Sequence, residues 1–183
     1  RRAVVGGEAL GSADVATLRR LNPDIRVVNE YGPTEATVGC IAGDIGENDQ
    51  VSIGRPIAGA RVWVVGRDGE LVPQGVWGEL YVGGPCLARG YLGRPALTEE
   101  RFIEPEILDR ERCYRTGDRV RFLSDGRLEC SGRLDDQVKV RGHRVELGEI
   151  EHHIAAQANV ERALVILREG ELIAYVVGDT RGL

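Results

Sequence analysis

Methionine is absent from this sequence of 183 residues, and Lys139 is the one lysine among its 24 basic residues. Aromatic residues make up only 5% of the chain, and no apolar run approaches the roughly 20 residues that a membrane-spanning helix needs. The formal net charge of −5 gives no electrostatic reason for binding to nucleic acid or to a membrane surface. We therefore expect a globular protein that binds neither. Because an initiator methionine and a targeting signal are both missing, we also expect the chain to be an excerpt of a longer one.

Cysteine pairs with metal-binding or redox spacing are missing as well. The four cysteines are scattered, without a CxxC pair: Cys40, Cys86, Cys113 and Cys130. Isolated cysteines of this kind are typical of small, mostly buried thiols in a reducing compartment. The sequence therefore predicts unpaired thiols and a cytoplasmic location.

The first part of the chain has the pattern of a strand, a helix and a second strand. An apolar strand over residues 2–5 ends at a Gly-Gly pair, and Ser12 is expected to cap a helix that continues to Leu21. Asn22-Pro23 ends this helix, and residues 25–28 form the next strand. Such a unit predicts a parallel α/β sheet that binds ligands beyond the carboxyl ends of its strands. The loops at residues 6–8 and 29–35 both lie at that edge.

The remaining chain is richer in short strands. From residue 51 to 133, apolar runs alternate with Asp-Gly turns, which predicts β-hairpins in a small barrel-like sheet, and a short helix is expected to begin at Thr98. After residue 133, the pattern predicts a hairpin, a helix with an apolar stripe over residues 147–158, and a second hairpin. The fold class is therefore mixed α/β, in three parts at 1–50, 51–133 and 134–183.

Residues 29–35, with the sequence NEYGPTE, carry the clearest chemistry. The Gly-Pro turn after a strand presents an aromatic ring, a hydroxyl and a carboxylate together. A ring can stack on a base, a hydroxyl can donate to a phosphate, and a carboxylate can hold Mg²⁺ beside that phosphate. Taken alone, the same heptapeptide is also compatible with an ordinary polar turn.

Four further motifs in a fixed order decide between these interpretations. They are GELYVGG at 78–84, ARGYL at 88–92, YRTGD at 114–118 and the long run GRLDDQVKVRGHRVELGEIE at 132–151. Together with NEYGPTE, they make the chain resemble the adenylation domains of nonribosomal peptide synthetases, in the superfamily of acyl-CoA synthetases and luciferases. The resemblance covers nearly the whole chain and implies the adenylate-forming, acyl-CoA synthetase-like fold. In that fold, residues 1–50 would end the α/β core, 51–133 would form its β-rich barrel-like part, and 134–183 would be an incomplete mobile lid.

The resemblance implies an ATP- or AMP-binding site with Mg²⁺. Tyr31 would stack on adenine, Thr34 would contact the α-phosphate, and Glu35 would coordinate Mg²⁺. Asp118 would accept hydrogen bonds from both ribose hydroxyls, and Arg133 would reach the ribose or the phosphates. The other residues of the nucleotide site would be Gly7, Glu8, Asn29 and Gly32.

By the same resemblance, the lid would rotate between two half-reactions about a hinge at Asp135. Lys139 would enter the site in the second state, which gives the solitary lysine a physical role. Arg141 and Gly142 would line the tunnel for the phosphopantetheine thiol of a carrier protein. The glycine-rich phosphate loop, the aspartate that binds the α-amino group and the catalytic lysine of the family are not in this sequence, so the 183 residues alone are expected to be inactive.

Five positions would line the amino-acid pocket: Val4, Gly6, Glu30, Val38 and Gly39. The glycines leave room, the valines give apolar walls, and the Glu30 carboxylate offers a buried acceptor that repels acidic substrates. This combination looks like family pockets that select asparagine.

The implied partners are a peptidyl carrier protein and a condensation domain of the same synthetase. A small activator protein of the MbtH-like kind would dock near Ala96. Two alternatives stay open. One is an acyl-CoA synthetase-type ligase, and the other is a non-catalytic interaction module derived from the same fold.

Overall fold

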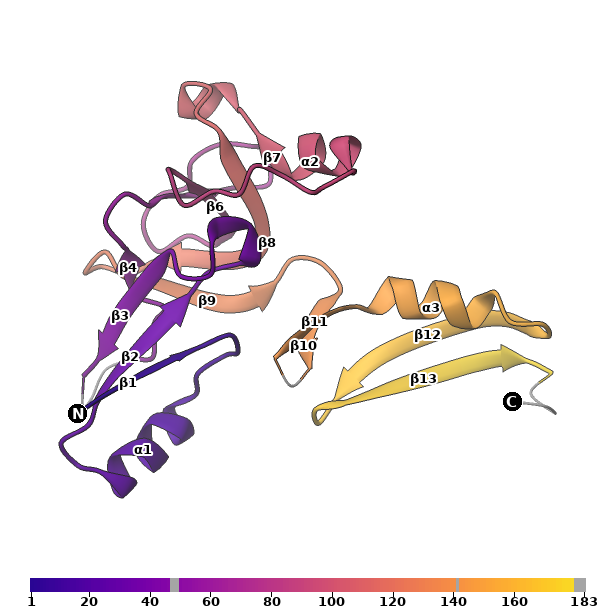
Figure 1. Cartoon of the computed structure of the whole chain (residues 1–183), viewed down its shortest axis with the longest axis horizontal. Helices are drawn as coiled ribbons and strands as arrows, with labels where there is room; N and C mark the ends of the chain where they lie inside the picture. The colour runs from indigo at the N-terminus through magenta and orange to yellow at the C-terminus, as the bar shows by residue number, and fades with distance from the viewer. Residues whose placement is uncertain (47–49, 141, 180–183) are drawn as a thin grey trace. The chain divides into compact units, whose positions relative to one another are not determined.

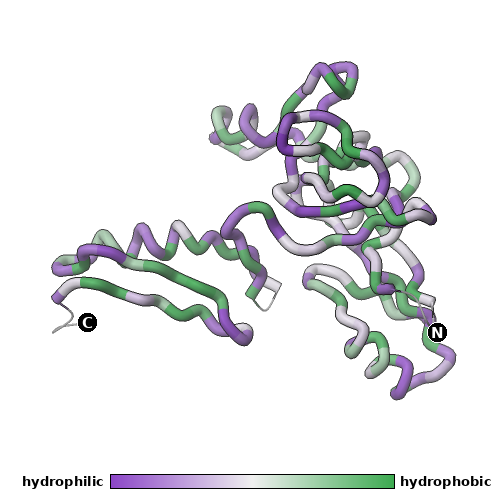
Figure 2. The backbone as a smooth tube through the Cα atoms, turned by 180° about the vertical axis from the view of Figure 1, so that it is seen from behind, coloured by the Kyte–Doolittle hydropathy of each residue, from purple (hydrophilic) through white to green (hydrophobic). Residues whose placement is uncertain are grey.

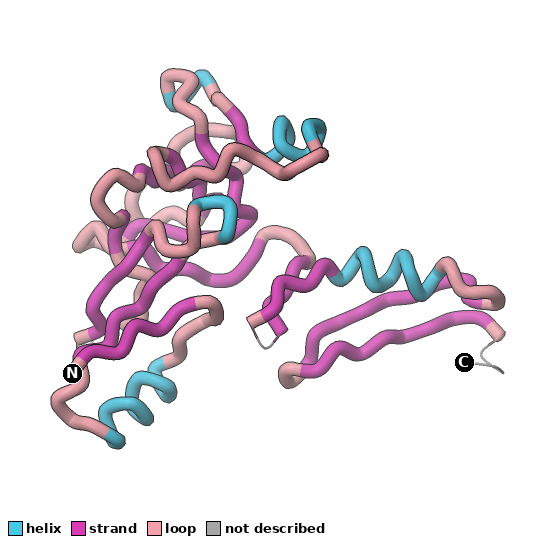
Figure 3. Tube along the Cα trace, viewed as in Figure 1, coloured by secondary structure: helices cyan, strands magenta, loops and turns pink. Residues whose placement is uncertain are grey.

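The computed structural model describes residues 1–46, 50–140 and 142–179 of the chain. The chain divides into two compact units, Arg1–Leu134 and Asp135–Leu183. Figure 1 shows the order of the elements along the chain, and Figure 3 shows which segments are helix, strand and loop.

The first unit begins with the predicted strand, helix and strand, followed by two more strands. This sheet has the order β1-β2-β3-β4. Its elements are β1 (Arg2–Gly6), α1 (Ser12–Leu21), β2 (Arg26–Tyr31), β3 (Ile41–Ile45) and β4 (Arg55–Pro56). Strands β1 and β2 are parallel, as predicted, whereas β3 and β4 are antiparallel additions.

The side chains of α1 explain why it lies on one face of this sheet. Val15 and Leu18, three residues apart, pack against Val5 and Val27 of the two parallel strands. The predicted cap was wrong. Ser12 is the first residue of the helix, and the Asp14 carboxylate instead accepts a hydrogen bond from the Gly11 N–H at 2.9 Å.

A second sheet forms the rest of the first unit. It has the order β5-β6-β8-β7, and β9 also pairs with β8. The elements are η1 (Thr34–Ala36), β5 (Arg61–Val65), β6 (Gly78–Gly83), α2 (Pro95–Arg101), β7 (Phe102–Ile103), η2 (Glu106–Leu108), β8 (Cys113–Phe122) and β9 (Leu128–Arg133). Helix α2 begins at Pro95 instead of the predicted Thr98, because the fixed φ of proline suits the first helical position and its missing N–H needs no partner there.

One hydrophobic core joins the two sheets. Buried residues from the β2–β3 loop and β3, including Cys40 and Ile41, pack with Leu80 and Val82 of β6 and with Leu128 of β9. The Ile53 N–H donates to the Leu128 carbonyl at 2.8 Å, and the Leu128 N–H donates to the Gly54 carbonyl at 2.7 Å. These contacts fix the carboxyl end of β2 beside β8 and β9, where the predicted site residues lie.

The second unit contains the predicted hairpin, helix and hairpin. Its elements are β10 (Gln137–Val140), β11 (His143–Glu146), α3 (Leu147–Ala155), β12 (Val160–Arg168) and β13 (Glu171–Gly178). The Glu151 carboxylate of α3 accepts a hydrogen bond from the Val165 N–H of β12 at 2.8 Å, which ties helix to hairpin. Figure 2 shows that β12 and β13 are largely hydrophobic along their length.

The structure describes the surroundings of the four cysteines and the lengths of the helices. None of the four cysteines forms a disulfide; Cys40 and Cys113 are buried, and Cys86 and Cys130 are half-buried. No helix in the described part of the chain is both long and apolar enough to span a membrane.

Burial predicts two classes of thiol reactivity. Burial raises the pKa of Cys40 and of Cys113 to about 12, so at pH 8 only about one thiol in ten thousand is ionised. Brief treatment of the native protein with iodoacetamide should therefore modify Cys86 and Cys130 and spare Cys40 and Cys113, as measured by peptide mass spectrometry. Under denaturing conditions all four should react alike, and equal labelling of the four in the native protein would contradict the described burial.

Candidate functional site

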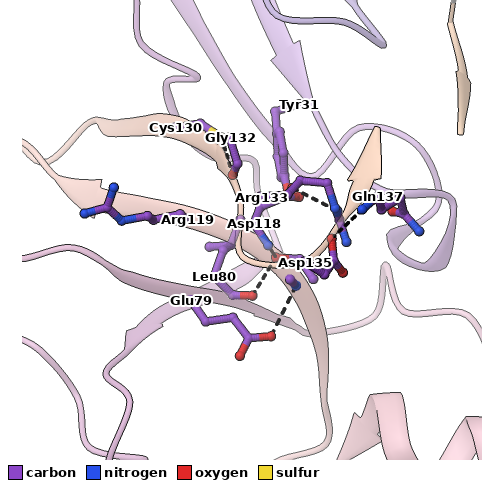
Figure 4. Close-up of polar contacts among 12 residues, drawn as sticks. Tyr31, Glu79, Leu80, Asp118, Arg119, Cys130, Gly132, Arg133, Asp135 and Gln137 are labelled. Carbon is purple, nitrogen blue, oxygen red and sulfur yellow. Dashed lines mark hydrogen bonds and ion pairs between the residues drawn. The ribbon is translucent and has the colours of Figure 1, made fainter. Parts of the chain in front are cut away.

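Tyr31, Asp118 and Arg133 meet where the two sheets of the first unit join. Tyr31 ends β2, whereas Asp118 of β8 lies opposite Arg133 of β9 in the strand register. The Tyr31 hydroxyl donates to Oδ2 of Asp118, and Nη1 of Arg133 donates to Oδ1 at 2.9 Å (Figure 4). The side chains of Arg133 and Asp118 are only 15% and 14% exposed. Residues 87 positions apart in the sequence thus form one polar cluster.

The electrostatics of this cluster favour a charged carboxylate with neutral and cationic donors around it. Burial, and then the negative charge of Asp118, raises the pKa of Tyr31 well above its ordinary value, so the phenol stays protonated and remains a donor. The guanidinium of Arg133 compensates the charge of Asp118. Because a carboxylate offers about four acceptor sites, Asp118 is suited to accepting hydroxyl groups of a ligand as well.

Backbone and side-chain hydrogen bonds hold the segment before Asp118 in place. The Thr116 hydroxyl accepts from the Asp118 N–H at 2.9 Å and donates to the Leu80 carbonyl at 2.8 Å. The Glu79 carboxylate accepts from the Gly117 N–H at 3.2 Å. In Figure 4, Leu80 and Glu79 lie below Asp118. They fix the carboxylate where β8 departs from regular pairing with β9, between Asp118 and Val120.

The loop between β2 and β3 folds back tightly on itself. A Cβ atom placed on Gly32 would lie 1.8 Å from the carbonyl oxygen of Val38, so only glycine fits there. Thr37 and Val38 both have positive φ, 56° and 72°, a conformation that is costly for β-branched residues. The Thr37 hydroxyl donates to the Cys86 carbonyl and helps to keep this conformation. Backbone strain of this kind concentrates at functional sites.

Within this loop, Thr34 is exposed and Glu35 is buried, with 7% of its surface exposed. The Tyr91 hydroxyl donates to Oε1 of Glu35 at 2.5 Å. Burial, and then the hydrogen bond to Glu35, raises the pKa of Tyr91. The sequence-based prediction missed Tyr91 as a neighbour of Glu35, although the tyrosine lies in the quoted motif at 88–92.

Gly6 and Glu30, two of the five predicted pocket residues, lie together at the carboxyl ends of β1 and β2. Gly6 pairs with Glu30 in the parallel register, and Val4, two residues earlier, shares its face of the sheet. The Glu30 carboxylate lies against Gly39, because a Cβ at that glycine would be 2.3 Å from Oε1. Val4 and Val38 are 60% and 66% exposed.

The other predicted nucleotide residues are distributed around this edge. Gly7 and Glu8 lie in the exposed loop after β1. Asn29 is buried, and its side-chain amide donates to the Ser52 carbonyl at 2.8 Å, so this group has a partner inside the fold. The contacts predicted between these residues and a nucleotide stay predictions.

The residues predicted for the lid lie in the second unit. Asp135 is its first residue, and its carboxylate accepts a hydrogen bond from the Gln137 N–H at 3.3 Å. Lys139 is exposed on β10, opposite Arg144 of β11, and Gly142 lies in the turn between these strands with a φ of 80°. Arg141 lies outside the described residues.

The residues of the first unit fit a magnesium ion that arrives with a phosphate. No group of three His, Cys, Asp or Glu residues within the described ranges is arranged to hold a metal by itself. Mg²⁺ typically uses one or two carboxylates together with the oxygens of substrate phosphates. Glu35 in the β2–β3 loop is a carboxylate suited to that kind of site.

Comparison with known proteins decides the family. The family model described as "AMP-binding enzyme" matches residues 1–92. The chain belongs to the AMP-binding enzyme family. Among curated relatives, gramicidin S synthase 2 of Aneurinibacillus migulanus is 43% identical over 98% of this chain, and tyrocidine synthase 3 of Brevibacillus parabrevis is 44% identical over 96% of it. The chain spans only 4% and 3% of these relatives' lengths.

Two solved structures have the same fold as this chain. Holo-PA1221, described as an NRPS protein containing adenylation and PCP domains, matches with a TM-score of 0.89 and 33% identity over 98% of this chain and 33% of its own. IdnL1 matches with a TM-score of 0.90 and 30% identity over the whole chain and 39% of its own. The predicted mixed α/β fold and the resemblance to adenylation domains are therefore confirmed.

The tight turn at Gly32 gives a test of the site's architecture in this AMP-binding protein. Replacing Gly32 with alanine forces the β2–β3 loop away from the Val38 carbonyl, because the added methyl overlaps it. Gly32→Ala should lower the free energy of unfolding of the first unit by about 1–3 kcal/mol in urea denaturation.

Gly148→Ala is the matched control. A Cβ at Gly148, in α3, meets nothing within 4 Å, so this change should be neutral or stabilise by up to about 1 kcal/mol. Equal effects of the two substitutions would show that the Gly32 turn is less tight than described.

Proposed function

We propose that this chain is part of an amino-acid-activating adenylation domain of a nonribosomal peptide synthetase. The reaction joins an amino acid to ATP, giving aminoacyl-AMP and pyrophosphate, and then passes the aminoacyl group to a carrier-protein thiol. The observation that carries the proposal is the cluster of Tyr31, Asp118 and Arg133 in a family named for binding AMP. The catalytic unit would be the complete domain, of which this chain would be a part.

Each residue of the Tyr31, Asp118 and Arg133 cluster has a proposed role that suits its surroundings. The Tyr31 ring would stack on adenine, and the Asp118 carboxylate would accept both ribose hydroxyls in the bidentate way that a carboxylate allows. Arg133, held beside Asp118, would add positive charge near the ribose or the phosphates. This arrangement stabilises developing negative charge by fixed groups and requires no covalent intermediate with the enzyme.

Thr34 and Glu35 would act on the phosphate side. The exposed Thr34 hydroxyl would contact the α-phosphate, and the buried Glu35 would hold Mg²⁺, which neutralises phosphate charge when it is bound. Gly7, Glu8, Asn29 and Gly32 would shape the edge at which the nucleotide lies.

The second unit would serve the transfer step. Asp135 would be the hinge between two orientations of the unit, and Lys139, exposed on β10, would enter the site in the second orientation. Arg141 and Gly142 would line the path of the phosphopantetheine thiol. The naming of adenylation and PCP domains in a matched structure supports a peptidyl carrier protein as the partner. A condensation domain of the same synthetase and an MbtH-like activator, docking near the exposed Ala96, would be further partners.

Asparagine is the proposed substrate. The Glu30 carboxylate lies against Gly39 and the Glu30 backbone carbonyl lies against Gly6, so both glycines let the chain pack closely around an acceptor of N–H groups. Val4 and Val38, both largely exposed in this chain, would give the apolar walls. A pocket with a buried acceptor can reject a substrate that lacks the matching donor by on the order of 10⁴-fold.

The test is ATP–pyrophosphate exchange by the complete domain with a panel of amino acids and fatty acids. Asparagine should give the fastest exchange, aspartate should be poor because of repulsion by Glu30, and fatty acids should give none. In Glu30→Gln, the preference for asparagine over aspartate should fall by about tenfold or more, since the repulsion is lost. Exchange with fatty acids alone would replace the proposal with an acyl-CoA synthetase, and fast exchange with aspartate beside inert asparagine would refute the pocket assignment.

A further inference from the structure

The segment that leads into α2 holds Glu35 from two directions. Oε1 of Glu35 accepts the Tyr91 hydroxyl at 2.5 Å, and the Glu35 carbonyl accepts the Ala88 N–H at 2.8 Å. Because only 7% of Glu35 is exposed, its carboxylate depends on donors within the protein for its solvation. Tyr91 is such a donor, and it comes from a segment 56 residues further along the chain.

The Tyr91 side chain is itself fixed by aromatic neighbours. Its ring meets the Phe102 ring edge-on, with centroids 5.7 Å apart, and Phe102 in turn packs against Tyr114 at 5.1 Å. The hydroxyls of Tyr91 and Tyr114 lie 3.5 Å apart, and the Tyr91 N–H donates to the Thr98 hydroxyl at 3.0 Å. Rings packed in this way restrict the torsions of Tyr91, so its hydroxyl is aimed at Glu35 before any ligand binds.

Arg112 braces the same segment through its guanidinium. This group lies over the Phe102 ring, 4.6 Å from the centroid, and donates to the carbonyls of Ala88 at 3.1 Å and Arg89 at 2.9 Å. The cation–π contact and two hydrogen bonds join the aromatic neighbours of Tyr91 to the main chain that binds the Glu35 backbone. Arg112 therefore connects the two groups that hold Glu35, the Tyr91 hydroxyl and the Ala88 N–H.

We propose that Tyr91 is a positioning residue for the metal site: its hydroxyl holds the Glu35 carboxylate in the orientation that binds the divalent ion accompanying ATP. This inference rests on the proposed function, because it takes Glu35 as the metal ligand. Partners that orient a metal-binding side chain by hydrogen bonding typically contribute roughly 10- to 100-fold to metal affinity. Tyr91 would act through Glu35 alone, without touching the ion.

The experiment measures binding of Mn²⁺, as a probe for Mg²⁺, to the complete domain in the presence of a non-hydrolysable ATP analogue. The free Mn²⁺ signal in electron paramagnetic resonance gives the affinity without turnover. Tyr91→Phe keeps the ring and its packing but removes the hydroxyl, so Mn²⁺ binding should weaken by about 10- to 100-fold. The Mg²⁺ concentration for half-maximal pyrophosphate exchange should rise in parallel, whereas KM for the amino acid should stay unchanged.

Tyr81→Phe is the matched control, because it removes a phenol hydroxyl from a buried tyrosine of the same unit. The Tyr81 ring lies on β6, with the guanidinium of Arg115 5.8 Å from the ring centroid, and packs with Val65, Leu108 and Cys113. This variant should bind Mn²⁺ like the unaltered protein, and a loss equal to that of Tyr91→Phe would overturn the inference.

Glu35→Gln separates the positioning role of Tyr91 from the metal-binding role of Glu35. If Tyr91→Phe binds Mn²⁺ like the unaltered protein while Glu35→Gln does not, positioning by Tyr91 is overturned and the proposed metal ligand stands. If Glu35→Gln binds normally too, Glu35 is not the ligand and both proposals fall. In Tyr91→Phe, a rise in the amino-acid KM equal to the loss of metal affinity would also overturn the inference, since it would indicate general damage to the site.

Discussion

The hydrophobic core between the two sheets of the first unit is the constraint on which the site depends, because it brings Tyr31 and Asp118 together. A carboxylate that is 14% exposed must be compensated, and here it is compensated by a phenol from one sheet and a guanidinium from the neighbouring strand of the other. Tyr31 can reach Asp118 only because the core of Cys40, Ile41, Leu80 and Leu128 fixes the two sheets against each other. The packing of apolar side chains thus sets the geometry of a polar site.

The conformation of the β2–β3 loop is also fixed by close packing and hydrogen bonds. Gly32 lets the chain turn directly after Tyr31, and the two β-branched residues with positive φ allow the loop to return to β3 within a few residues. Each such residue costs about 1–3 kcal/mol unless the surroundings enforce it. The Thr37 hydroxyl on the Cys86 carbonyl and the Ala88 N–H on the Glu35 carbonyl supply part of that enforcement. The loop is therefore held by the segment that also carries Tyr91.

The sequence predicted the regular elements well where local chemistry decides them. The spacing of Val15 and Leu18 defined α1, and the turn residues separated β12 from β13. The prediction failed at the start of α2 and at the cap of α1, where several residues compete for the same position. The motifs identified Tyr31, Glu35 and Asp118 as site residues. No spacing rule connects Glu35 with Tyr91, because that contact arises from tertiary packing between residues 56 positions apart. The exposure of Val4 and Val38 was likewise invisible to residue type alone.

The central claim is that Tyr31 and Asp118 grip a single nucleotide, one by its base and the other by its sugar. A crystal structure of the complete domain with AMP bound tests this most directly. The account predicts the adenine ring against the Tyr31 side chain and the ribose hydroxyls within hydrogen-bonding distance of the Asp118 carboxylate. AMP bound elsewhere, with neither contact formed, would contradict it.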